Sequence, residues 1–366
     1  MECVPNFSEG RDKKIISQIA EAIGSVSGSR VLNVDPGEAA NRTVITFAGE
    51  PEAVAEAAFR GAEAAARLID MSRHHGTHPR IGATDVLPFV PVSGITLDEC
   101  ALMARRLGRR MADELGIPVY LYEAAALRPE FRNLAVCRAG EYEGIAQKLA
   151  SPSLRPDLLP PPTGSPAPPS GSLCSGAAAA LPPAGSPSPA SGSPCSGVAA
   201  ALPPAGSPSS PSGSLCSGAA AALPPAVRRS GCSVVGARDY LIAVNFNLNT
   251  PSAAIATAIA RQVRERGYQG RPGTLRCVKA IGWYIEEYGR AQVSCNLTNF
   301  RVTSLRQAFD EVSRVARLHG VSVTGTEIIG LVPQQALFPD AVRILGLDDL
   351  RPFNPEEKII ENVLNR

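Results

Sequence analysis

The chain has 366 residues, a length that accommodates two or three domains of ordinary size. Its 36 Lys and Arg residues nearly balance its 34 Asp and Glu residues, and aromatic residues make up 5%, so the composition gives no reason to expect nucleic acid or an anionic membrane as a partner. The N-terminus has charged residues where a signal peptide needs an apolar run, and no stretch approaches the roughly 20 apolar residues of a membrane span.

The first half of the chain predicts a β-α-β-β-α-β unit. Isoleucines between positions 15 and 23 fall on one face of a helix, and β-branched runs flank a loop that contains Pro36 and Gly37. A long Ala-rich helix opens with Pro51, which suits the first turn because an N–H would have no partner there. The expected elements are a strand at 2–5, a helix at 13–24, strands at 30–35 and 43–48, a helix at 51–70, a strand at 85–92 and an additional helix at 97–115.

The composition changes abruptly between Pro152 and Ala226, where Pro, Ser, Gly and Ala dominate. A unit of 21 residues recurs there, and the same period separates Cys174, Cys195 and Cys216. Each unit offers only a short Ala run before two prolines, which neither forms a stable helix nor provides a face for stacking. The segment is therefore predicted to be a disordered insert, and a tandem expansion without function is favoured over a docking role.

The second half repeats the order of elements seen in the first. The expected elements are a strand at 239–247, a helix at 253–266, strands at 275–285 and 291–297, a helix that starts near 305 and stops at 320, a strand at 321–324 and a C-terminal helix at 355–364. The predicted fold is α/β (α+β), with two ferredoxin-like βαββαβ subdomains and a cleft between them. The predicted boundaries are 1–151 for the N-terminal subdomain, 152–226 for the insert and 227–366 for the C-terminal subdomain.

The nine cysteines are odd in number, and the sequence contains no C-x-x-C pair. Most of them are embedded singly in apolar segments, which is typical of buried thiols. This pattern favours reduced cysteines over a disulfide framework. We therefore expect a soluble protein in a reducing compartment, the cytoplasm.

Three of the four histidines, His74, His75 and His78, lie within five residues. Gly76 and Pro79 interrupt any helix there, so the segment is predicted to be a loop between the long helix and a strand. Three interpretations are open: polar loop residues that satisfy local carbonyls, a metal site built on the i,i+4 pair, and general acid–base chemistry near neutral pH. The broken helix and the lack of a partner ligand with suitable spacing count against the metal.

Other polar residues lie in or beside sharp loops at strand ends. Alone, each of these loops is more often a turn than a site. The cations beside them are able to bind carboxylates, because an arginine in particular matches a carboxylate with two parallel hydrogen bonds. For any one of them, a solvated surface charge is the default. The turn residues are Asn6, Asp35 and Gly273, and the cations are Arg42, Arg80 and Lys279.

Taken together, nine peptides of this sequence resemble the glutamate formimidoyltransferase (formiminotransferase) family. They occur in the family's order over the whole chain except for the Pro/Ser/Gly/Ala insert. One such peptide carries little weight, whereas nine in order make the match specific. The peptides are ECVPNFSEG, VLNVDPG, NRTVITFAG, RLIDMSRHHGTHPRIGATDVLPFVPV, GEYEG, VGARDYLIAVNFNLNT, IGWYIEEYGRAQVSCNLTNF, GTEIIGLVP and RPFNPEEKIIE.

The resemblance implies a dimeric transferase with two α/β subdomains and a cleft that holds its substrates. The family's reaction moves the formimino group of N-formimidoyl-L-glutamate to N5 of tetrahydrofolate in histidine breakdown. Tetrahydrofolate is then a co-substrate, and no metal is expected. The match is to the single-function form of the family, so a separate cyclodeaminase is expected to act on the product.

The resemblance also implies roles for individual residues. The histidine of G-x-H-P-R, here His78, is the catalytic one, and Asp35 of VDPG matches a carboxylate that positions the substrate. A neutral His78 would take the proton that N5 loses and deliver it to the departing glutamate nitrogen. The folate-contacting positions are Gly231, Gly273, Thr274 and Leu275, and the candidates for substrate contacts are Asn6, Arg42, Arg80 and Lys279.

Other activities stay open beside this one. A formyltransferase that uses N-formylglutamate differs by one O/NH exchange in the donor, which the peptides do not distinguish. A folate-binding protein without catalysis is the second alternative, because the insert displaces most of a folate-contacting stretch that begins near Asp157 and ends at Gly231. An RNA-binding role ranks below both, since the aromatic strand signature of RNA-binding βαββαβ units is missing.

Overall fold

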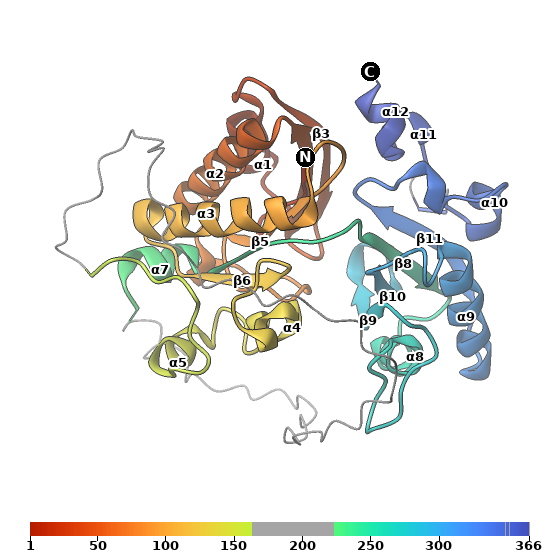
Figure 1. Ribbon diagram of the computed structural model, residues 1–366. Coiled ribbons are helices and arrows are strands. Elements are labelled where there is room, and N and C mark those ends of the chain that lie inside the picture. Colours follow the sequence, from red (N-terminus) through yellow and green to blue (C-terminus); the bar gives the residue numbers. More distant parts are fainter. Residues whose placement is uncertain (163–222, 348, 351, 366) are drawn as a thin grey trace, which may run out of the picture.

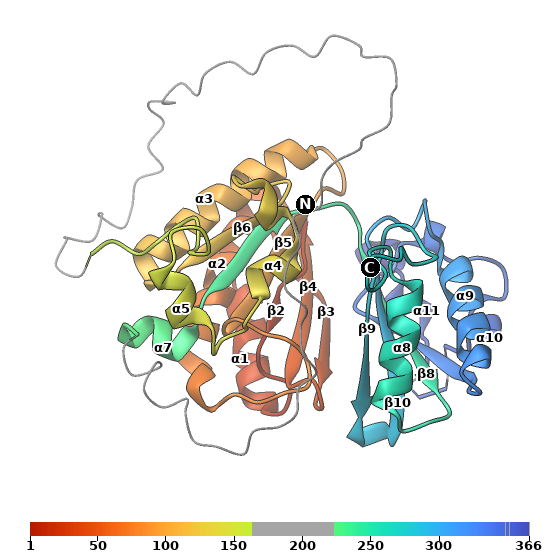
Figure 2. The ribbon, with the colours of Figure 1, turned by 90° about the horizontal axis from the view of Figure 1, so that it is seen from below.

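A computed structural model describes residues 1–162, 223–347, 349–350 and 352–365 of the chain. These residues form two sheets, one of seven strands and one of four. Helices cover the outer side of each sheet, and the two sheets turn their other faces toward each other (Figure 2). Most of the predicted insert, and with it the prediction of disorder, lies outside the described residues.

The first sheet has the strand order β1-β4-β2-β5-β7-β6, and β3 pairs with the other edge of β4. Pairing is antiparallel from β1 to β5, whereas β7 runs parallel to both β5 and β6. The strands are β1 (Glu2–Cys3), β2 (Asn6–Phe7), β3 (Ser29–Gly37), β4 (Arg42–Gly49), β5 (Thr84–Val90), β6 (Val119–Glu123) and β7 (Ser233–Ala237).

Three long helices pack against this sheet and share one apolar core with it (Figure 1). The first begins where the Asp12 side chain accepts hydrogen bonds from two backbone N–H groups, and the third begins at a reciprocal capping box of Thr96 and Glu99. These caps lie at the predicted helix starts. The helices are α1 (Lys13–Gly24), α2 (Pro51–Leu68) and α3 (Leu97–Leu115), and shorter ones are η1 (Met71–Arg73), η2 (Pro129–Arg132), α4 (Leu134–Arg138), α5 (Ile145–Ala150) and α7 (Pro225–Ser230).

Strands β6 and β7 lie outside the predicted elements. Because β7 pairs with β5 and β6, the chain re-enters the first sheet after the undescribed residues and only then crosses to the second. The C-terminal subdomain is predicted to begin at residue 227. In the structure, residues 233–237 still belong to the first sheet. Both strands are short and almost entirely buried, so they lack the alternation that reveals a half-exposed strand.

The second sheet is antiparallel throughout, with the order β11-β8-β10-β9. With its two helices it has the element order β-α-β-β-α-β, so the ferredoxin-like unit predicted for this half is confirmed. The elements are β8 (Ile242–Leu248), α8 (Ala253–Val263), β9 (Val278–Ile285), η3 (Glu286–Tyr288), β10 (Arg290–Leu297), α9 (Leu305–Leu318), β11 (Val323–Ile329), η4 (Gln334–Ala336) and α10 (Ala341–Leu345).

Two predictions near the C-terminus are wrong in their bounds. The strand expected at 321–324 extends over β11 instead, and the single helix expected at 355–364 is divided into α11 (Pro355–Lys358) and α12 (Ile360–Leu364). The division falls at Ile359, whose extended backbone forms a β-bridge with Val332. Tertiary pairing therefore overrides helix propensity at this residue.

The six cysteines within the described residues are free thiols: Cys3, Cys100, Cys137, Cys232, Cys277 and Cys295. The three that lie in the repeat, Cys174, Cys195 and Cys216, are outside the described residues. Across the described ranges, helices long and apolar enough to cross a bilayer are absent.

Candidate active site

The histidine loop follows α2 and η1, and its three histidines occupy different environments. His74 is buried and its Nε2 lies 2.8 Å from the carbonyl oxygen of Asn41, whereas His75 is exposed and His78 is half-buried. In the part of the chain that the structure describes, no cluster of three or more His, Cys, Asp or Glu side chains is arranged to hold a metal ion. The loop passes close to other backbone at Gly76, where a Cβ would lie 2.2 Å from the carbonyl oxygen of Ala40.

His78 lies at the junction of the two units. Its ring centroid is 5.7 Å from a ring centroid of Trp283 on β9, and the ring planes are tilted by 60°. Its Nδ1 lies 2.7 Å from the carbonyl oxygen of Pro79. A carbonyl oxygen only accepts, so we assign the proton of the neutral imidazole to Nδ1. Nε2 is then the basic nitrogen of the ring.

The surroundings of His78 keep its imidazole neutral. Burial lowers the pKa of His78 well below its ordinary value of 6.5, and the positive charges of Arg42 and Arg138 lower it further. Asp85 and the hydrogen bond to Pro79 act in the opposite direction without reversing the shift. A neutral imidazole at physiological pH is the form that accepts a proton.

Asp85 on β5 is fully buried and bridges two arginines. Nη1 of Arg42 and Nη2 of Arg138 both donate to Oδ2 of Asp85, and Nε of Arg138 donates to Oδ1 at 3.3 Å. Burial opposes ionisation of Asp85, but the charges of Arg138 and Arg42 hold the pKa of this carboxyl below its usual range. Burial lowers the pKa of Arg42 to about 10. Two positive charges therefore share one carboxylate beside His78.

Among the predicted substrate-binding residues, Asn6 and Arg42 are in direct contact. Nε of Arg42 donates to Oδ1 of Asn6 at 2.9 Å, and the Asn6 amide donates to the carbonyl of Val4 at 3.1 Å. The turn that contains Asn6 therefore holds one edge of the Arg42 guanidinium in place.

Arg80 is buried and bonded to two carboxylates. Its Nη1 donates to Glu141 at 2.9 Å and to Glu143 at 2.8 Å, and its Nη2 donates to Glu143 at 2.6 Å. The hydrogen bonds that Arg80 donates to Glu143 raise the pKa of Arg80 above its ordinary value. These bonds tie the GEYEG segment to the histidine loop and compete with the predicted contact between Arg80 and a substrate carboxylate, which stays a prediction.

Asp35 joins the two units. It lies on β3, in register with Val44 of β4, and its Oδ2 accepts hydrogen bonds from the Gly330 N–H and from Nζ of Lys358, each at 2.9 Å. Both donors belong to the second unit. The sequence predicted Asp35 as a catalytic carboxylate, and the structure gives it contacts that hold β3 against the end of β11.

Gly231 contacts the residues that follow the histidine loop. It forms a β-bridge with Gly82, and its φ of +70° together with a Cβ position 2.3 Å from the carbonyl oxygen of Ile81 leaves room only for glycine. The predicted folate-contacting position Gly231 is therefore next to the strand that leads away from His78.

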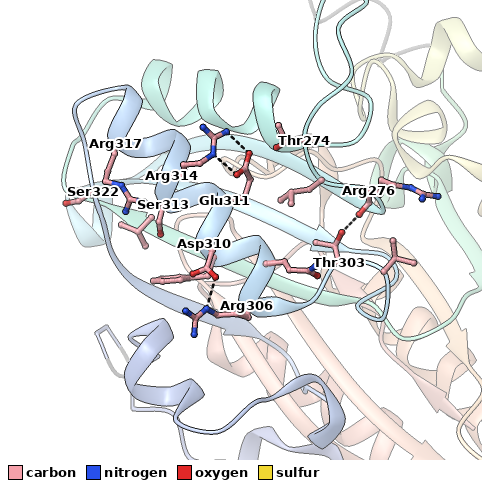
Figure 3. A pocket seen from close by; sticks show the side chains of 15 residues that line it. Thr274, Arg276, Thr303, Arg306, Asp310, Glu311, Ser313, Arg314, Arg317 and Ser322 are labelled. Carbon is pink, nitrogen blue, oxygen red and sulfur yellow. Dashed lines mark hydrogen bonds and ion pairs between the residues drawn. The ribbon is translucent and has the colours of Figure 1, made fainter.

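The predicted folate-contacting turn of Gly273, Thr274 and Leu275 lies in the second unit. Thr274 and Leu275 line a surface pocket of about 1060 Å³ beside α9 (Figure 3). Two of its lining cations are paired, as Figure 3 shows for Arg306 with Asp310 and for Arg314 with Glu311. All of its lining residues belong to the second unit, so this pocket is separate from His78.

A polar chain on the inner face of the second sheet fixes Trp283. The indole Nε1 donates to Oε1 of Gln292 at 2.9 Å, and Nε2 of Gln292 donates to Oδ1 of Asn247 at 2.7 Å. Lys279, on the same strand as Trp283, places its Nζ 3.4 Å from a carboxylate oxygen of Glu123 at the end of β6. The second unit thus reaches the first at two points along β9.

Sequence reasoning missed several residues of this site. Asp85 and Trp283 lie within the peptides that carry the family resemblance, yet neither was singled out, and Arg138 was not considered. The position of Asp85 beside an apolar strand is a signal of a buried ion pair. Such an aspartate is expected to be buried, and an aspartate is almost never fully buried unless it is paired. Nothing in the local sequence around Arg138 shows that its partner is 53 residues away.

The fold and the site define a two-unit α/β protein with a neutral histidine at the junction of its units. Residues 1–178 match the model of the formiminotransferase domain, N-terminal subdomain, and residues 243–342 match that of the formiminotransferase domain. The chain belongs to the formiminotransferase family.

Relatives match along the full length of the chain. The glutamate formimidoyltransferases of Thermoplasma acidophilum and Streptococcus pyogenes are each 34% identical, with 100% of this chain and 98% of the relative covered. The formimidoyltransferase-cyclodeaminase of Sus scrofa is 38% identical over 99% of this chain. The chain spans 59% of the length of that pig protein.

Proposed function

We propose that the chain transfers the formimidoyl group of N-formimidoyl-L-glutamate to N5 of tetrahydrofolate, which gives L-glutamate and 5-formimidoyltetrahydrofolate. The observation that carries this proposal is the position of the neutral His78 at the junction of the units, in a chain whose relatives named glutamate formimidoyltransferase match over 98% of their length. Tetrahydrofolate acts as a co-substrate, and the proposed proton transfers use only side chains of this protein.

His78 carries the proton transfers. N5 of the pterin attacks the amidine carbon of the donor and loses a proton, which Nε2 of His78 accepts. The bond between that carbon and the glutamate nitrogen then breaks, and His78 returns the proton to the departing nitrogen. The hydrogen bond from Nδ1 to the Pro79 carbonyl holds the ring in one tautomer throughout, which keeps Nε2 available.

The remaining roles follow from charge. The reacting amidinium is a cation, so Asp35 is proposed to stabilise it as a second catalytic residue. Gly231 and the turn of Gly273, Thr274 and Leu275 are proposed to contact folate. Lys279, Arg80 and Arg42, with Asn6 beside the last, are proposed to contact the carboxylates of the two substrates.

Further proposals concern the setting of the enzyme. We propose a cytoplasmic homodimer whose product passes to a separate cyclodeaminase, with no nucleic acid or membrane partner. The free thiols among the described cysteines support a reducing compartment. The relatives from Thermoplasma acidophilum and Streptococcus pyogenes are named for the transferase alone, which supports a separate cyclodeaminase.

The test is turnover by the purified full chain with tetrahydrofolate and either N-formimidoyl-L-glutamate or N-formyl-L-glutamate, followed by release of L-glutamate. Glutamate release from the formimidoyl donor alone, or much faster than from the formyl donor, supports the proposal. Preference for the formyl donor would make the protein a formyltransferase. Binding of tetrahydrofolate without release from either donor would make it a folate-binding protein.

A further inference from the structure

The arginine pair on Asp85 has donors that its neighbours do not use. Nη2 of Arg42 and Nη1 of Arg138 have no hydrogen-bond partner in the described part of the chain. Neither nitrogen is among the fully buried atoms that lack a partner, so both are accessible. The side chains themselves are only 8% and 13% exposed, so each mostly buried guanidinium offers one accessible nitrogen without a partner.

The charges of this cluster are not balanced within it. Two guanidinium groups face the single carboxylate of Asp85, while His78 is held neutral. Buried positive charge is unfavourable unless an anion accompanies it. A carboxylate is the anion that suits the geometry, because guanidinium edges bind it through charge-assisted hydrogen bonds.

The position of the cluster decides which carboxylate suits it. The backbone N–H of Ile81, three residues after His78, donates to Oδ1 of Asp85 at 2.9 Å, so the cluster lies against the histidine loop. In the donor, the α-carboxylate is on the carbon next to the nitrogen that carries the transferred group. The γ-carboxylate is farther along the side chain, and the carboxylates of folate are separated from N5 by the aminobenzoyl ring.

We propose that Arg42 and Arg138, held side by side by Asp85, bind the α-carboxylate of the amino-acid donor. The proposal rests on the proposed function and deepens it, because it assigns Arg138 to the donor and fixes which end of glutamate faces His78. Asp85 acts as a positioning residue that holds both guanidinium groups and does not itself touch the donor.

The test is calorimetric titration of the full chain, with and without saturating tetrahydrofolate, against the product L-glutamate. Wild type is expected to bind L-glutamate, and Arg138→Gln is expected to weaken this binding about 10- to 100-fold. Arg138→Lys keeps the charge but loses the paired donors and is expected to lie between them, and it serves if Arg138→Gln does not fold. Arg106→Gln, in an exposed pair between α3 and α2, is the matched control and should bind L-glutamate as wild type does.

Three further probes separate the sources of the carboxylate. L-Isoglutamine lacks the α-carboxylate and should bind weakly to wild type, whereas L-glutamine keeps it and should lose affinity in Arg138→Gln. The folate-tail fragment p-aminobenzoyl-L-glutamate should bind equally to wild type and variant. Unchanged L-glutamate binding in both Arg138 variants, no binding to wild type, or loss of the folate fragment instead would overturn the proposal. Binding of L-glutamate that depends on Arg138, without any transfer of the formimidoyl group, would contradict the proposed function and still support this carboxylate-binding site.

Discussion

The ring centroids of His78 and Trp283 lie 5.7 Å apart, and the two residues belong to different units of the chain. Trp283 is fixed from behind by Gln292, which is almost fully buried and bonded in turn to Asn247. The second unit therefore supplies one wall of the site around the histidine loop. A change in how the units pack would change the surroundings of His78 directly.

Because Trp283 is the only tryptophan of the chain, its fluorescence reports on His78. An imidazolium quenches a nearby indole more strongly than a neutral imidazole does. The pKa of His78 is lowered by burial and by Arg42 and Arg138, so the emission should stay constant through pH 6.5 and fall only at clearly lower pH. Emission titrated against pH, with circular dichroism to confirm that the chain stays folded, checks this.

His78→Gln is the control for that titration and should remove the transition. A transition centred near pH 6.5 in wild type would contradict the lowered pKa.

The lowered pKa of His78 also makes stability depend on pH. Below pH 6.5 this histidine binds a proton in the unfolded chain but stays neutral in the folded chain, so the unfolded state is favoured. The contribution of neutral His78 to the free energy of unfolding is fully present above pH 6.5 and is lost as the pH falls. Acidification should therefore lower the urea midpoint more in wild type than in His78→Gln.

Gln292→Leu should loosen Trp283. The substitution leaves the indole N–H and the side-chain oxygen of the buried Asn247 without their partner, at a cost of about 1–3 kcal/mol. We expect a lower urea midpoint and a shifted, broadened Trp283 emission. Gln292→Glu keeps an acceptor for the indole and should preserve the emission better. Identical emission spectra in wild type and Gln292→Leu would show that Gln292 does not position the ring.

Asp85→Asn should be strongly destabilising. It leaves two buried guanidinium groups facing each other without a compensating charge, and removal of one partner from a buried pair costs about 3–5 kcal/mol. Urea unfolding measures this cost. Asp310→Asn removes the acid of an exposed pair on α9 and should cost under about 1 kcal/mol. Equal losses of stability in the two variants would show that the buried Asp85 ion pairs stabilise the fold no more than an exposed pair does.

Arg80→Gln should affect stability more than donor binding. Its hydrogen bonds to Glu141 and Glu143 are charge-assisted, and such bonds contribute about 1.5–3 kcal/mol each when both partners are held in place. The two glutamates are partly exposed, so the observed loss should lie toward the lower end. Urea unfolding and steady-state kinetics of the variant should show a lower midpoint with only a small rise in the KM for the donor. A large rise in KM at unchanged stability would instead show that substrate contact is the main role of Arg80.

Much of the fold could be predicted from the sequence because its long helices carry their own signals. The helices expected at 13–24 and 97–115 have the predicted bounds, since both combine an apolar face with a cap at the first turn. Strand β7 could not be found this way. Its neighbours β5 and β6 are more than a hundred residues away in sequence, and its burial on both faces removes any alternation.

The sequence predicted the loop of the site and single residues such as Arg42, but not the pairings around them. The cluster of histidines and the breakers Gly76 and Pro79 locate the loop, and the family resemblance selects His78. The partners that set the charge around it come from distant segments, as the pairing of Asp85 with Arg138 shows. Pairings of this kind arise from tertiary packing and leave no periodic trace in the sequence.

Proton transfer by His78 is the central step of the proposed reaction, and its direct test is the single-turnover rate of formimidoyl transfer in His78→Gln. With both substrates saturating, we predict a rate about 10²- to 10⁴-fold below that of wild type, the usual contribution of general acid–base catalysis. The variant should keep the wild-type urea midpoint at neutral pH and its affinity for tetrahydrofolate. A folded His78→Gln chain that transfers the group as fast as wild type would contradict a role for His78 in proton transfer.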